Sequence, residues 1–402
     1  MHSPSFASRW PRRKTYSIAV GLTIATILLV LCYRAPSISL RGIAMKTSAD
    51  DLYNTPHSNF FQTVKSSTKS SQTNPSSSPA YDLPPGVFEL IRPHVTSITA
   101  KNFTSRTGKV YQLPEAPRFT KPMRNQILIL DVESRDIGGP GGLLDDGTPS
   151  TDDLQGLTLG RLNHYMFAKL HGYDYQLVQL PVDPTLHGTW NKVPAMREAI
   201  KHYEYVVFMD GDAIFTHPHL PLEWLLNYWG VSDNTTMALA EDPSDPFFLN
   251  VKRLDINLNT GFVIAHQTPR SEEFFEAWMT CPDETRYPGC GMWKLTHTHE
   301  QAVVNEYLRY DYPEEIQILP CTEANRYPNS GDCEGEFISH YWPFKDMIPA
   351  GAKEVMAQYF WPPLQKAYSH DRDNIVIAMD APAKEEDTHD TKKPDAEARH
   401  TA

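Results

Sequence analysis

The stretch that decides the fold is Tyr205-Val-Val-Phe-Met-Asp-Gly-Asp212. Five consecutive apolar residues are typical of a strand that is covered on both faces of its sheet. Side chains two positions apart in extended chain point the same way, so Asp210 and Asp212 can face one cation. Open α/β sheets bind ligands outside the carboxyl ends of their strands. The pattern therefore predicts a metal and ligand site here, and the alternative is an acidic turn without function.

Strand and helix signals alternate on both sides of this stretch, over residues 121–370. Apolar residues recur at helical spacing before Gly172, which suits a helix C-terminus. Strands that alternate with helices indicate an α/β fold with a mostly parallel sheet. The predicted strands are 126–130, 173–178, 205–209, 237–240, 262–265 and 316–319, and the predicted helices are 159–170, 193–203, 268–279 and one that begins near residue 298.

An uncharged apolar run at residues 16–33 predicts one membrane-spanning helix. Eighteen helical residues span roughly 27 Å, enough for a thin bilayer. Arg9, Arg12, Arg13 and Lys14 precede the run, which places residues 1–15 in the cytosol and the rest of the chain in the lumen. A cleaved signal peptide is the alternative, but its apolar region would be shorter and would end in small residues.

Composition sets the remaining organisation and excludes two classes of protein. Residues 34–120 are rich in Ser, Thr and Pro and predict a low-complexity stem, and residues 371–402 predict a disordered tail. A mean hydropathy of −0.45 excludes a transporter with many spans. The net charge of −12 argues against nucleic-acid binding, which needs a basic face.

The cysteines and the glycosylation sequons agree with a lumenal domain. Cys32 lies in the apolar run, which leaves four cysteines and three ways to pair them. We favour the local pairs Cys281–Cys290 and Cys321–Cys333 in an oxidising compartment. A zinc site is the alternative, although no C-x-x-C spacing occurs. Asn102 and Asn234 each begin an acceptor sequon.

Two further polar motifs follow the acidic pair along the chain. Asn259-Thr-Gly261 precedes the predicted strand 262–265, where its amide and hydroxyl groups can bind sugar hydroxyls; an ordinary turn is the alternative. Glu300 and Gln301 open a predicted helix, in which Thr298 and Gln301 also fit a capping box. His297 and His299 lack the HExxH pattern of a zinc helix and are expected to be surface residues.

His340 and Lys345 lie together in a short aromatic segment, residues 337–345. An imidazole that joins two carboxylates makes a mixed nitrogen and oxygen site, which suits Mn²⁺ better than Ca²⁺. A lysine can hold a phosphate as a point charge. A histidine buried in the core for packing is the alternative for His340.

The order of these motifs resembles glycosyltransferase family 34, the galactosyl- and mannosyltransferases of fungi and the xyloglucan xylosyltransferases of plants. The resemblance covers residues 126–345. Two departures stand out: Pro343 and Phe344 replace the usual Gly-Cys, and Glu300 replaces an Asp. The matching motifs are Asn163-His-Tyr-Met-Phe-Ala168 with His171-Gly172-Tyr173, Trp190-Asn-Lys192-Val-Pro194-Ala195, Asp210-Gly-Asp212, Asn259-Thr-Gly261, Glu300-Gln301 and His340.

The resemblance implies a GT-A fold, which is Rossmann-like, and a single-pass type II protein of the Golgi membrane. It implies a nucleotide-sugar donor, linked to UDP or GDP, a glycan acceptor and retention of anomeric configuration. It also implies a homo- or hetero-oligomer with other Golgi transferases. By this resemblance Asp210, Asp212 and His340 bind Mn²⁺, Lys192, Asp210, Gly261 and Lys345 bind the donor, and Asn259, Glu300 and Gln301 are catalytic.

The chemistry leaves two mechanisms and two alternative functions open. No side chain must be a covalent nucleophile, so same-face substitution and double displacement are equally compatible with the sequence. A haloacid-dehalogenase-type phosphatase also places D-x-D after an apolar strand, but there a Gly-Thr or Gly-Val follows the second Asp, and Ala213-Ile214 follows here. A carbohydrate-binding scaffold without catalysis is the other alternative.

Overall fold

The computed structural model describes residues 86–375, apart from 146, 148, 149, 151, 182, 245–249, 251–254, 327–332 and 334. Every described residue lies in one compact unit within residues 76–402. The predicted membrane segment 16–33, residues 34–85 and residues 376–402 lie outside the described residues. Within the described ranges, no helix combines the length and the apolar character needed to span a bilayer.

A six-stranded sheet in the order β4-β3-β5-β8-β7-β9 forms the centre of the domain. The ladders β3–β4, β3–β5 and β7–β9 are parallel, and β8 is antiparallel to both of its neighbours. Five strands therefore run one way, which confirms the predicted α/β fold with a mostly parallel sheet. The strands are β3 Ile127–Glu133, β4 Asp174–Gln179, β5 Tyr205–Met209, β7 Met237–Glu241, β8 Leu258–His266 and β9 Ile316–Leu319.

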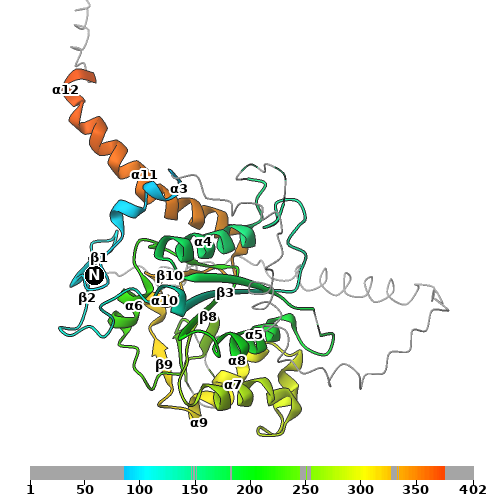
Figure 1. Ribbon diagram of the computed structural model, residues 1–402. Coiled ribbons are helices and arrows are strands. Elements are labelled where there is room, and N and C mark those ends of the chain that lie inside the picture. Colours follow the sequence, from blue (N-terminus) through cyan, green and yellow to red (C-terminus); the bar gives the residue numbers. More distant parts are fainter. Residues whose placement is uncertain are drawn as a thin grey trace, which may run out of the picture. The chain divides into compact units, whose positions relative to one another are not determined.

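Helices cover both faces of this sheet, as Figure 1 shows with α4 (Gly156–His171) on one side and α5 (Lys192–Ala199) on the other. The helix α4 ends at Gly172, whose φ of 75° lies in the left-handed region, as predicted. The remaining helices are α3 Gly86–Glu89, α6 Leu222–Trp229, α7 Ser271–Met279, α8 Glu300–Val303, a π-turn Val304–Leu308, α9 Arg309–Asp311, α10 Cys321–Ala324, α11 Ile348–His370 and α12 Arg372–Ile375. Short 3₁₀ turns lie at Arg92–His94, Arg124–Gln126, Gly188–Asn191, Cys281–Asp283, Cys290–Lys294 and Lys345–Met347.

A two-stranded antiparallel sheet, separate from the six-stranded sheet, brings together two segments that lie far apart in the sequence. It pairs β6 (Ala213–Phe215) with β10 (Ile338–His340), and His340 lies opposite Ala213. Because β6 begins directly after Asp212, this register places the imidazole beside the acidic pair. This short pair of strands therefore brings His340 next to Asp210 and Asp212, from which it is far removed in the sequence.

The folded region begins well before residue 121, so the predicted boundary of the stem at residue 120 is wrong. The strands β1 (Asn102–Thr104) and β2 (Val110–Gln112) form a hairpin. Phe103, Tyr111 and Phe119 are buried in the main hydrophobic core. Aromatic residues spaced through a polar segment supply enough apolar burial to anchor it to the domain.

The predicted disulfides Cys281–Cys290 and Cys321–Cys333 are both present, so the local pairing is confirmed and the zinc alternative is excluded for these cysteines. Both sequon asparagines, Asn102 and Asn234, are exposed.

Candidate active site

Three potential metal ligands meet at the carboxyl end of the sheet. Asp210 follows β5, Asp212 precedes β6, and His340 ends β10. One ligand atom from each lies within 4.8 Å of the other two, the only such group among the described residues. The His340 Nε2 atom is 3.2 Å from Asp212 Oδ1 and 3.9 Å from Asp210 Oδ2. Two carboxylates and an imidazole suit a divalent cation of intermediate softness.

The imidazole of His340 is held so that Nε2 faces the two carboxylates. Its Nδ1 lies 3.1 Å from Asn325 Oδ1, a carbonyl oxygen that can only accept, so Nδ1 carries a proton. The Asn325 amide is oriented in turn because its Nδ2 donates to Glu241 O and Asp242 Oδ1. Such support is typical of histidines that bind metals through the other ring nitrogen. The donor set and its orientation therefore fit a cation.

Gly261 leaves the space in which this imidazole lies. A Cβ atom at position 261 would be 2.0 Å from His340 Cε1 and 2.5 Å from Nε2. The backbone adds a second constraint, since Gly261 O accepts from the amide of Asp210. The prediction that Asn259-Thr-Gly261 precedes the strand is wrong, and so is the alternative of an ordinary turn, because all three residues lie within β8. The strand pairs on either side of the motif, with Leu258 on β7 and Phe262 on β5, override the local turn preference of Asn and Gly.

Lys192, the first residue of α5, is buried, and its positive charge offsets the negative charges of Asp210 and Glu300. Its Nζ is 3.1 Å from Asp210 Oδ1 and 3.2 Å from Glu300 Oε1, and it donates to Thr260 O. Desolvation raises the pKa of the Asp210 carboxyl above its ordinary value, an increase that Lys192 opposes and Asp212 reinforces. A buried ammonium between two carboxylates thus fixes the position of Asp210.

Lys345 lies on the outer side, with its Nζ 3.1 Å from Asp212 Oδ2 and its side chain 58% exposed. Burial alone would raise the pKa of Asp212, but the hydrogen bond and charge of His340 and the charge of Lys345 hold it well below its usual range. Asp212 is therefore ionised and ready to bind a cation. Since Lys345 reaches the site from solvent, it can also contact a ligand.

The predicted catalytic residues lie on the β8 side of the triad. Asn259 donates to Asp242 Oδ1 at 2.8 Å, and Gln301 Oε1 accepts from the Thr260 amide at 3.2 Å. The capping box predicted for Gln301 is wrong, because no side chain caps α8 and the Gln301 side chain contacts β8 instead. Glu300 is buried and accepts from the Thr260 hydroxyl at 3.0 Å.

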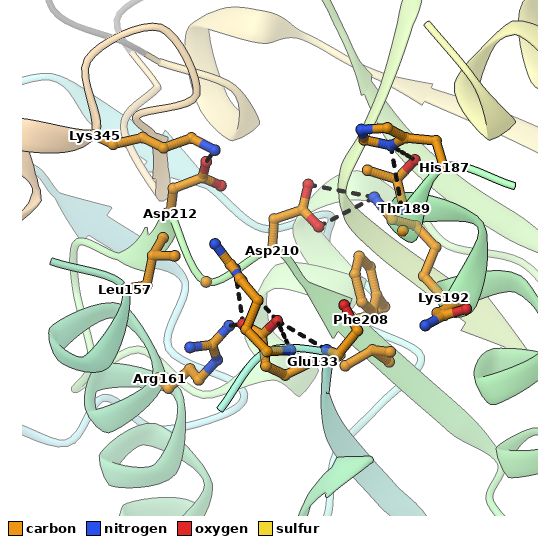
Figure 2. Close-up of a pocket in the computed structure, with 16 residues that line it drawn as sticks. Glu133, Leu157, Arg161, His187, Thr189, Lys192, Phe208, Asp210, Asp212 and Lys345 are labelled. Atoms are coloured by element: carbon orange, nitrogen blue, oxygen red, sulfur yellow. Dashed lines mark hydrogen bonds and ion pairs between the residues drawn. The ribbon is translucent and has the colours of Figure 1, made fainter. Parts of the chain in front are cut away.

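Two adjoining pockets share the acidic pair. Pocket A, of about 340 Å³, lies between β3 and α5, and Figure 2 shows Lys345 and Asp212 at one side of it and Glu133 with Arg161 at another. Pocket B, of about 430 Å³, lies on the β8 side and is lined by Asn259, Glu300, Gln301 and His340. The residues that line both pockets are His187, Thr189, Lys192, Asp210, Asp212 and Lys345. A cation in the triad would thus lie where the two pockets join.

The predicted surface histidines take part in Pocket B. His297 is exposed, whereas His299 is half-buried and stacks on His187 with ring centroids 3.6 Å apart. Both His297 and His299 line the pocket. The surface prediction therefore holds for His297 and is incomplete for His299.

Sequence reasoning missed two parts of the site. Asp242 is buried and follows β7 as Asp210 follows β5, so the same strand-then-carboxylate signal could have found it. Burial raises its pKa, and hydrogen bonds from Asn259 and Asn325 oppose the increase. Glu133 ends β3 at the floor of Pocket A, where it pairs with the buried Arg161. No local sequence signal marks Arg161, since it lies in the middle of α4.

Most residues of the candidate site lie within a segment that is similar to a known protein family. The galactosyl transferase GMA12/MNN10 family, which is glycosyltransferase family 34, matches residues 160–344. Its range includes the metal triad, Lys192 and the β8 motif, so the chain is a glycosyltransferase. The family match favours a glycosyltransferase over the phosphatase alternative for the D-x-D motif.

Solved structures of glycosyltransferases are also similar to this chain. One is involved in the glycosylation of the major capsid of PBCV-1 (13% identity, TM-score 0.41, 56% of this chain and 98% of that one). Others are the galactosyltransferase LgtC with donor and acceptor sugar analogs (9%, 0.35, 57% and 95%) and mouse xyloside xylosyltransferase 1 (10%, 0.33, 55% and 98%). A comparison with curated protein sequences finds no match.

Proposed function

We propose that this protein is a metal-dependent, retaining glycosyltransferase of GT-A type that moves a hexose or pentose from a nucleotide sugar to a glycan. The observation that carries the proposal is the convergence of Asp210, Asp212 and His340 where Pockets A and B join. A nucleotide sugar has two unlike halves joined by a diphosphate. Two pockets that meet at a cation site match that layout.

Asp210, Asp212 and His340 would hold the ion, for which we propose Mn²⁺ because of the mixed nitrogen and oxygen donors. Such an ion neutralises a diphosphate and improves it as a leaving group. The chain adds its own charge: Lys345, more than half exposed, can turn from Asp212 to a phosphate oxygen. Lys192 keeps Asp210 in place from the buried side.

The nucleoside would occupy Pocket A and the sugar Pocket B. Pocket A offers Arg135, whose guanidinium is held by Glu133 at 2.7 Å while its side chain stays 64% exposed. Pocket B offers the amides of Asn259 and Gln301, which can bind sugar hydroxyls. The acceptor would enter Pocket B past His297 and His299.

Two routes to retention stay open, since Pocket B contains two carboxylates besides the metal pair. Glu300 is tied to Lys192 and Thr260, and Asp242 is tied to Asn259 and Asn325. These contacts do not identify either Glu300 or Asp242 as the nucleophile. Same-face substitution needs no such residue, whereas double displacement needs one of them.

We also propose that the chain is a single-pass type II protein of the Golgi membrane with a lumenal catalytic domain. The support is the uncharged run at residues 16–33 with its basic flank, the two disulfides and the two exposed sequons. Membrane fractionation with protease protection tests this placement.

The function is tested by a donor screen. The full chain, purified in detergent, is incubated with Mn²⁺, a panel of UDP- and GDP-linked sugars and glycan acceptors, and nucleotide release is measured. The proposal predicts release with at least one donor, loss on chelation and loss in Asp212→Asn. Tight nucleotide binding without turnover on any acceptor would favour the carbohydrate-binding scaffold instead.

A further inference from the structure

A third pocket lies at the other end of α4 from the metal triad. The helix begins beside Lys345, since a Cβ atom at Gly156 would be 3.0 Å from Lys345 O, and its last residue, His171, lines the third pocket. Sixteen helical residues span roughly 24 Å. This cavity, which we call Pocket C, has a volume of about 730 Å³ and is larger than Pocket A or Pocket B. Pocket C is therefore a separate site of a size that suits a small ligand.

Three cations line Pocket C and come from three separate parts of the chain. Arg92 begins the turn Arg92–His94, Arg124 begins the turn Arg124–Gln126, and Lys169 lies in the last turn of α4. All three are exposed, and none of them forms an ion pair with another described residue. Carboxylates are abundant in a chain whose net charge is −12, so three cations left without one around a single cavity indicate an anionic ligand.

The carboxylate that lines Pocket C leaves the donors of these cations free for a ligand. Glu223 is buried, its Oε1 accepts from the Met123 amide at 2.7 Å, and its Oε2 accepts from the Tyr173 hydroxyl at 2.5 Å. Both oxygens are thus bonded to neutral donors. Among the described lining residues there is no other carboxylate, and the charge of Glu223 offsets at most one of the three cations.

The end of α4 accounts for only one of the cations. A basic side chain in the last turn of a helix interacts favourably with the exposed carbonyl groups there, which explains Lys169, whose Nζ also lies 5.4 Å from the ring centroid of Tyr165. Arg92 and Arg124 belong to other elements. Arg124 has a φ of 51°, which residues other than glycine rarely adopt, and its Cγ lies 3.9 Å from the position of a Cβ at Gly172. The Arg124 side chain is therefore held against the end of α4.

His171 adds a hydrogen-bond acceptor to the lining of Pocket C. Its Nε2 lies 2.8 Å from Pro218 O, which can only accept, so Nε2 carries the proton. Burial lowers the pKa of the imidazole from 6.5 to about 4, so the ring is neutral near pH 7 and Nδ1 keeps its lone pair. Nδ1 has no hydrogen-bond partner among the described residues. A hydroxyl group of a ligand can donate to this atom, whereas a simple inorganic anion has no use for it.

We propose that Pocket C binds a sugar that carries a phosphate or carboxylate group. Arg92, Arg124 and Lys169 supply donors for the anionic oxygens, since guanidinium and ammonium groups are the usual partners of such groups. His171 and Thr120 supply groups that bond to sugar hydroxyls. A neutral sugar would leave the three cations unused. The inference concerns binding alone and does not depend on the proposed transfer reaction.

The test is a calorimetric titration of the full chain, purified in detergent, in a buffer with a chelator and without donor. The probes are glucose 6-phosphate, glucuronate, glucose and inorganic phosphate. We expect one or both of the charged sugars to bind at least 10-fold more tightly than glucose and inorganic phosphate, since only they use the cations and the hydroxyl-binding groups together. Preference for glucose 6-phosphate identifies the anionic group as phosphate, and preference for glucuronate identifies it as carboxylate.

Two variants locate the bound sugar. Arg92→Gln and Arg124→Gln should each weaken its binding about 10-fold, because each removes a charge-assisted hydrogen bond. Lys109→Gln, at an exposed lysine outside Pocket C, is the matched control and should bind as the wild type does. All three substitutions are at exposed positions, so thermal unfolding of the variants should match that of the wild type.

The proposal is overturned if neither charged sugar releases heat at millimolar concentration, or if glucose or inorganic phosphate binds as tightly. Wild-type affinity in both arginine variants would overturn it as well. So would displacement of the bound sugar by UDP, since that result would place the sugar in the nucleotide site. Because no metal or donor is present, these outcomes leave the donor screen of the proposed function unaffected.

Discussion

Replacing Gly261 by alanine should remove the metal site without touching any ligand. The new Cβ would lie 2.0 Å from His340 Cε1, whereas carbon atoms in contact need roughly 3.5 Å or more. The imidazole must therefore move by about 1.5 Å, since β8 is fixed by strands on both sides. Metal–ligand distances tolerate only about 0.2 Å, so His340 would leave the coordination shell.

We expect Gly261→Ala to lower nucleotide release at fixed Mn²⁺ by about 100-fold or more, as misplacements of about 1 Å commonly do. The concentration of Mn²⁺ that gives half-maximal activity should rise by about 10–100-fold. The assay is an Mn²⁺ titration of donor turnover with the full chain. Gly86→Ala, whose Cβ would meet nothing within 4 Å, is the matched control and should behave as wild type.

A double variant separates loss of the ligand from general damage. If Gly261→Ala acts through the imidazole, adding it to His340→Ala should cause no further loss, because the two changes remove the same interaction. Activity of Gly261→Ala within a few-fold of wild type at low Mn²⁺ would refute the reasoning. Additive losses in the double variant would show that the alanine acts elsewhere.

Three further changes test the network around the site. Lys192→Met leaves the buried Glu300 and the partly exposed Asp210 without a counter-ion. It should lower the free energy of unfolding in metal-free buffer by about 3 kcal/mol, the lower end for a broken buried pair because solvent screens Asp210, measured by urea denaturation. An unchanged midpoint would contradict the pairing. Burial would raise the pKa of the Glu133 carboxyl, but hydrogen bonds and positive charge from Arg135 and Arg161 hold it at about 2, below its usual 4.5. The wild type should therefore lose stability as the pH falls from about 4.5 to 2, because Glu133 then takes up a proton and its ion pairs are lost. Glu133→Gln should flatten that part of the profile, and equal slopes in the two proteins would count against it. Opening Cys321–Cys333, 12 residues apart, by Cys-to-Ser replacement should cost about 3 kcal/mol in the same denaturation assay, and no loss would show that the bridge is dispensable.

Much of the fold was predictable because short-range patterns dominate it. The sequence of β5 is a continuous apolar run followed by two carboxylates, and this local pattern was enough to predict both the strand and the acidic pair. The predicted end of α4 at Gly172 followed from a local conformational preference. The cysteine pairs were close enough in sequence for the local solution to be favoured.

The errors arose where contacts distant in sequence override local preference. Asn259-Thr-Gly261 looks like a turn, but it lies within β8, where Gly261 O accepts from the amide of Asp210. Gln301 fits a cap, yet its side chain bonds to the Thr260 amide, which no local pattern reveals. The hairpin of β1 and β2 lies in a polar segment whose few aromatic residues pack on the core.

The central claim is that Asp210, Asp212 and His340 together bind one divalent cation. The most direct measurement is an Mn²⁺ titration of the full chain followed by electron paramagnetic resonance, in which free and bound ion differ. The account predicts one bound Mn²⁺ per chain, weakened at least 10-fold in Asp212→Asn and in His340→Ala. Unchanged Mn²⁺ affinity in both variants would contradict it.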